Sequence, residues 1–86
     1  MSERYEYELR NVPLMRIQEY WVEAGGTLTS ERSAEGVGWC AHLQALEAVT
    51  LFTITIPRDL LMIEGEAEAA RVTADFMRRK TMRGGG

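Results

Sequence analysis

Apolar and polar residues alternate almost without fault from residue 4 to residue 10. Tyr5, Tyr7 and Leu9 fall on one side and charged residues on the other, a pattern that predicts a half-buried strand. The apolar spacing then becomes helical until Gly25-Gly26, a pair that can adopt the left-handed conformation which ends a helix. The start of the chain therefore predicts a strand followed by a helix.

The longest unbroken run of β-branched and large apolar residues spans residues 49–56. It predicts a central strand that ends at Pro57, because proline has no N–H to donate to a strand ladder. Alternation would place Phe52, Ile54 and Ile56 against the core. The other face of this strand would carry Val49, Leu51, Thr53 and Thr55. This second face is too apolar for full exposure, so we expect it to contact a partner or a ligand.

The remaining segments have weaker patterns. They predict strands over 27–33 and 37–43 with a turn at 34–36, an ambiguous connection at 45–48, an edge strand or buried loop at 60–63, and a helix over about 65–82. The order of strand, helix, three or four strands and helix predicts an α+β fold, with an antiparallel sheet of four or five strands and both helices on one face. This outline is similar to the TATA-binding-protein-like fold and related two-layer sandwiches, which implies nothing about function.

Length and composition predict one domain over residues 1–83 with a flexible glycine tail at 84–86. The net charge of −3 argues against a dominant role in nucleic-acid binding. A single cysteine excludes an internal disulfide, and no apolar segment approaches the roughly 20 residues of a membrane-spanning helix. We expect a cytoplasmic protein without a membrane partner. The strong preference for Arg over Lys and the scarcity of Asn and Gln fit a bacterial, thermophilic source.

Cys40 and His42 are the only pair of residues with reactive potential. Two apart on a strand, they would share a face and could act as a nucleophile and its base, or as metal ligands. The chain has one Cys and one His, and no carboxylate spacing completes a recognisable metal motif. We therefore expect no catalytic residue, metal or cofactor, and a Cys that tends toward burial beside a His on a sheet face.

A basic cluster near the end of the second predicted helix is a candidate anion-binding or RNA-binding site. It consists of Arg78, Arg79, Lys80 and Arg83. The same helix has an acidic start, so the cluster is also explained by the helix dipole, which favours cations at the C-terminal end. The glycines that follow resemble the Gly-Gly end of ubiquitin-like sulfur carriers, whose terminal carboxylate is activated. The predicted strand order departs from theirs, which opens with a hairpin before the helix.

These observations favour a small non-enzymatic interaction module that forms a homodimer through the open face of its sheet. The candidate interface or ligand face consists of Cys40, His42, Val49, Leu51, Thr53 and Thr55. There are three alternatives. This face could contact another protein, or it could bind a small ligand or carry out enzymatic chemistry around Cys40 and His42. The basic cluster could bind RNA weakly.

Overall fold

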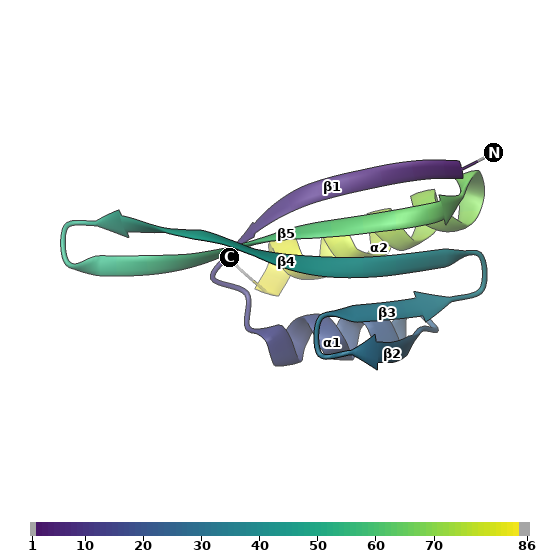
Figure 1. Ribbon diagram of the computed structural model, residues 1–86, viewed down its shortest axis with the longest axis horizontal. Coiled ribbons are helices and arrows are strands. Elements are labelled where there is room, and N and C mark those ends of the chain that lie inside the picture. Colours follow the sequence, from purple (N-terminus) through teal and green to yellow (C-terminus); the bar gives the residue numbers. More distant parts are fainter. Residues whose placement is uncertain (1, 85–86) are drawn as a thin grey trace.

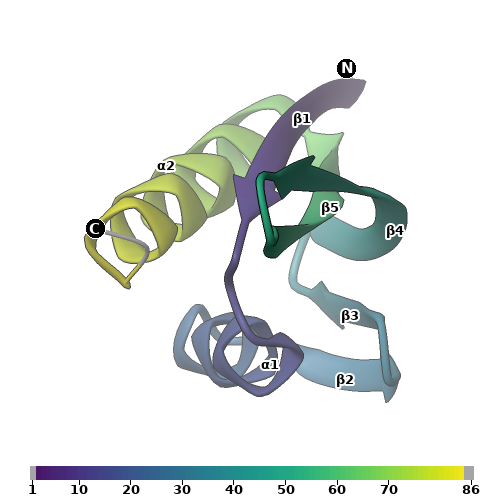
Figure 2. The same ribbon diagram turned by 90° about the vertical axis from the view of Figure 1, so that its left-hand side faces the viewer.

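The computed structural model describes residues 2–84, with side chains described through residue 82. Five strands and two helices follow one another in the order β1 (Ser2–Arg10), α1 (Leu14–Glu23), β2 (Thr27–Ser30), β3 (Ser33–Gly36), β4 (Trp39–Leu51), β5 (Ile54–Glu66) and α2 (Ala67–Gly84). All strand pairs are antiparallel, and the order across the sheet is β1-β5-β4-β3-β2. The predicted α+β fold with an antiparallel sheet and two helices is confirmed (Figures 1 and 2).

The core lies between the sheet and the two helices, which cover the same face (Figure 2). Trp21 and Ile17 of α1 are fully buried, as are Leu61 and Ile63 of β5. The predicted alternation in β1 is confirmed, since Leu9 is buried while the charged residues beside it are exposed. At this chain length a single compact core of this kind has to supply most of the stability.

Trp39 at the start of β4 packs closely against two glycines. A Cβ atom at Gly26 would lie 2.6 Å from the Trp39 ring, and one at Gly36 would overlap the same ring. Glycine is therefore required at both positions because the indole occupies the space that any side chain would need. This packing leaves Trp39 only 7% exposed.

The prediction of a central strand over residues 49–56 is wrong. The chain reverses at Phe52 and Thr53, so the segment forms the end of a hairpin between β4 and β5. Phe52 has a φ of 57°, in the region that favours glycine, yet the turn contains neither Gly nor Asn, so the sequence carried no signal for it. Pro57 lies inside β5, and its carbonyl accepts a hydrogen bond from the Asn11 N–H just past the end of β1. Its missing N–H therefore faces the point where the ladder with β1 stops, so no ladder bond is lost.

Other predicted boundaries also differ from the structure. Residues 34–36 belong to β3 and not to a turn, and the ambiguous segment 45–48 is part of β4. Residues 60–63 lie in β5, between β1 and β4, and so form neither an edge strand nor a loop. Pairing with strands that are distant in the sequence determined these elements, because the local patterns were weak.

The β4–β5 hairpin is longer than its neighbours in the sheet. β3 pairs with β4 only over residues 39–42, and pairing of β1 with β5 ends at Arg58. Residues 47–57 thus extend as a two-stranded projection, which we call the arm (Figure 1). We call the rest of the described chain the body. The arm explains why the molecule measures 44 Å along its longest axis and about half as much along the others, at 22 and 21 Å.

Candidate functional site

The sheet face opposite the helices, which we call the open face, has two parts. In the body, Cys40 and His42 lie on it and are exposed, while Trp39, Ala41 and Leu43 point to the core and are buried. Strict alternation along β4 produces this division, as the sequence predicted. The expectation that Cys40 tends toward burial is wrong, because no helix covers this side of the sheet.

On the arm, the open face is apolar. Val49 is paired with Ile56, and Leu51 with Ile54, so these four side chains project from one side. Leu51 is 52% exposed and Ile54 is 63% exposed, whereas the two residues nearer the body are half-buried. Phe52 at the tip is 100% exposed.

These placements revise the predicted interface. Ile54 and Ile56 were predicted to face the core, on the side opposite to Val49 and Leu51. In the structure they lie on the same side of the arm as those two residues. Thr53 lies in the turn, and Thr55 pairs with Thr50 on the other face of the arm. A two-residue turn changes which sequence positions share a face, and the switch from apolar 49 and 51 to apolar 54 and 56 was the signal that could have revealed it.

Charged side chains line the edge of the open face on β1. The Glu8 carboxylate lies 2.6 Å from Arg10 and 3.0 Å from Arg58, which comes from the base of the arm. The hydrogen bond from Arg10, together with the charges of both arginines, lowers the pKa of Glu8 below its ordinary value. On the same strand, the pKa of Tyr5 is raised, chiefly by its hydrogen bond to Glu3.

A shallow hollow of about 150 Å³ lies on the open face of the body. Cys40, His42 and Met62 contribute to its lining, with Arg4 and Glu64 at its sides. In the strand register, His42 is directly opposite Met62 and Cys40 is opposite Glu64. No group of three or more His, Cys, Asp and Glu side chains among the described residues is placed to hold a metal ion. The thioether of Met62 was not considered from the sequence, because no local spacing connects it to Cys40.

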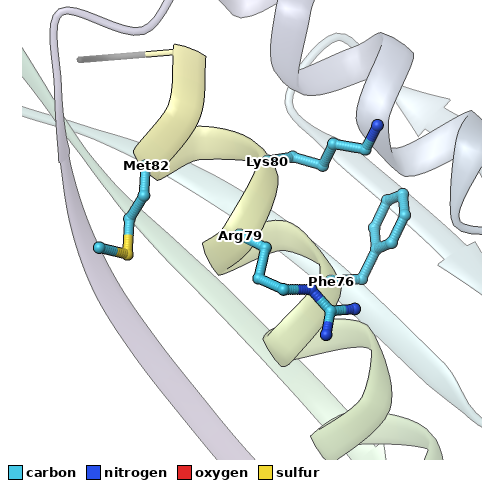
Figure 3. Close-up of a pocket in the computed structure, with 4 residues that line it drawn as sticks. All are labelled: Phe76, Arg79, Lys80 and Met82. Atoms are coloured by element: carbon cyan, nitrogen blue, oxygen red, sulfur yellow. The ribbon is translucent and has the colours of Figure 1, made fainter.

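A larger hollow, of about 440 Å³, lies along the last turns of α2 (Figure 3). Phe76, Arg79, Lys80 and Met82 line it, so two members of the predicted basic cluster share one depression with an aromatic ring and a thioether. Met82 is 69% exposed. This hollow is open and built largely from one helix.

The members of the basic cluster have different surroundings. Lys80 lies 2.7 Å from the Glu23 carboxylate of α1, and its ammonium is 5.5 Å from the centre of the Phe76 ring. This charge is therefore paired within the chain. Arg78 and Arg79 are exposed, and the side chain of Arg83 lies outside the described part. The arrangement agrees with cations that complement the end of a helix.

Comparison with protein families gives a match over nearly the whole chain. The family model described as archaeal MoaD-like protein matches residues 5–86, nearly the whole chain, so the chain belongs to this family. No curated protein matches it. Within the described residues, neither helix has the length and apolar character needed to cross a membrane.

Proposed function

We propose that this member of the archaeal MoaD-like family is a protein-interaction module that forms a homodimer through the open face, with the arm as the main contact. One observation carries the proposal: Leu51, Phe52 and Ile54 are exposed together at the end of a projecting hairpin. Three large apolar side chains gathered on a domain of this size mark an interaction surface, since burying them stabilises a complex by about 25 cal/mol per Å².

The backbone at Phe52 supports a role in binding. A residue with a side chain at φ 57° costs about 1–2 kcal/mol relative to glycine, and Phe52 makes no compensating burial within the chain. A strained conformation that presents a fully exposed aromatic ring is typical of a contact residue. Aromatic side chains are also enriched at the centres of protein interfaces.

A second copy is the partner that best fits the arm. One side of the arm carries Val49, Leu51, Ile54 and Ile56, and the other carries threonines, so two arms can pack face to face about a two-fold axis. The strand edges are also open, because β3 and β1 both end before the arm begins. The ion pairs along β1 would form a polar rim beside such a contact.

Sedimentation velocity at micromolar concentration tests the proposal. The wild type should sediment as a dimer, and Leu51→Lys should sediment as a folded monomer because a charge would be buried in the contact. Val37→Lys is the matched control: Val37 is 95% exposed in the turn between β3 and β4, so this variant should remain dimeric. A monomeric wild type would exclude the second copy as partner and leave contact with another protein, or a small ligand at the open face, as the remaining hypotheses.

A further inference from the structure

The hollow on the open face of the body brings three metal-binding groups together. The Cys40 thiol, the His42 imidazole and the Met62 thioether all line it. We propose that these three side chains bind one Cu(I) ion. Thiolate and thioether sulfur are the ligands that select Cu(I) over harder cations, and imidazole binds it as well.

The strand register makes simultaneous contact geometrically reasonable. His42 and Met62 are directly opposite one another on β4 and β5, which puts their Cβ atoms about 4.5–5.5 Å apart. Cys40 lies two residues from His42 on the same face, about 6.5–7 Å along the strand. Each side chain has rotatable bonds that can bring its donor atom toward a shared point between them. Both strands are flanked by neighbours over this region, so the backbone that carries the donors is firmly held.

Two charged residues at the hollow affect the binding in opposite directions. Arg4 donates a hydrogen bond to the Met62 sulfur over 3.1 Å, and its guanidinium also lies 2.8 Å from Glu6. A bound ion would require Arg4 to release the sulfur while it keeps its contact with Glu6, so Arg4 opposes binding. The Glu64 carboxylate, opposite Cys40, offsets part of that positive charge.

Binding exchanges a proton for the metal without a change of oxidation state. The Cys40 S–H bond breaks, the proton goes to solvent, and the thiolate forms a bond to Cu(I), while the nitrogen and the thioether donate lone pairs. Three donors are enough for Cu(I), whereas a structural Zn²⁺ site requires four.

This site lies on the body part of the open face, away from the arm that makes the main contact in the proposed dimer. His42 and Val49 are seven residues apart on β4, which corresponds to roughly 23 Å along an extended strand. Leu51→Lys should therefore retain copper binding, and loss of dimerisation would leave this proposal intact.

The test is an anaerobic competition titration with Cu(I) and the chelator bicinchoninate, using the full chain. The wild type should bind one equivalent per chain. Cys40→Ser, His42→Gln and Met62→Leu should each weaken binding by at least about tenfold, since even losing a group that only orients a ligand costs 10–100-fold. Arg4→Gln should tighten it. Met15→Leu is the matched control, because Met15 is 71% exposed on α1 and should not affect the titration.

The outcomes distinguish a three-ligand copper site from binding by the Cys40 thiol alone. X-ray absorption of the copper complex should show two sulfur ligands and one nitrogen, and Met62→Leu should remove one of the sulfurs. Binding that depends on Cys40 alone, with His42→Gln and Met62→Leu like the wild type, would overturn the proposal. The absence of competitive binding in the wild type would do the same.

Discussion

The body and the arm of this protein use large aromatic residues in opposite ways. Trp39 at one end of β4 is 7% exposed and packs against Gly26 and Gly36, whereas Phe52, just past the other end of the strand, is 100% exposed. One strand thus begins in the core and ends in solvent, because β3 and β1 stop before the arm and only β5 continues beside β4 (Figure 1). The comparison suggests that the body supplies the stability and that the arm supplies a surface for binding.

Truncating the two aromatic residues is the strongest test of this division. Trp39→Ala should lower the free energy of unfolding by about 3–5 kcal/mol, as expected for a large residue removed from a core. Phe52→Ala should change it by less than about 0.5 kcal/mol when the chain is monomeric, as for other exposed sites. Urea denaturation of both variants in the Leu51→Lys background measures the difference. Equal losses would mean that the arm tip packs within the chain.

Two substitutions that add or remove a side chain at a glycine-like backbone position should have smaller effects on stability, and the effects should differ in sign between body and arm. A Cβ atom at Gly65, in the body, would overlap the carbonyl oxygen of Gly38, so Gly65→Ala should cost about 1–3 kcal/mol. Phe52→Gly in the arm should be neutral or stabilise by up to about 1 kcal/mol, because glycine relieves the positive φ but adds freedom to the unfolded chain.

Thermal unfolding in the same monomeric background measures both variants. A destabilised Phe52→Gly variant would show that the phenyl ring contributes to folding, which contradicts the division between body and arm. If the proposed function is correct, Phe52→Gly should also weaken dimerisation in the chain that retains Leu51.

The smallest expected effect concerns the junction between body and arm, where Glu8 contacts Arg58. The folded-state pKa of Glu8 is lowered from 4.5, so its ion pairs stabilise the folded state above that pH. This contribution is lost as the pH falls through the lower pKa of the folded state, because the carboxyl becomes protonated. Glu8→Gln should therefore be less stable than the wild type at pH 7, with a difference that shrinks below pH of about 4.

Thermal unfolding as a function of pH checks this expectation. Glu31→Gln, at an exposed position in the turn between β2 and β3, serves as the control and should follow the wild type at every pH. A gap between Glu8→Gln and the wild type that persists unchanged at low pH would show that the ion pairs with Arg10 and Arg58 are not its cause.

Patterns within short segments of the sequence were sufficient for β1, both helices and the α+β class. Alternation in β1 and helical spacing before Gly25 arise from the backbone period of each element, which neighbouring residues alone determine. The same reasoning correctly divided Trp39 from Cys40 and His42. The bacterial, thermophilic source and the homodimer stay predictions from the sequence.

Only the tertiary structure decided where the chain reverses between residues 49 and 56 and which side chains share a face there. The turn at Phe52 and Thr53 lacks the glycine that usually marks such a turn, and a bulge opposite Pro57 shifts the register of the arm. It also brought Met62 beside His42, although 20 positions separate the two residues in the sequence. Strand pairing joins residues that are distant in sequence, so no local pattern contains the partner or the register.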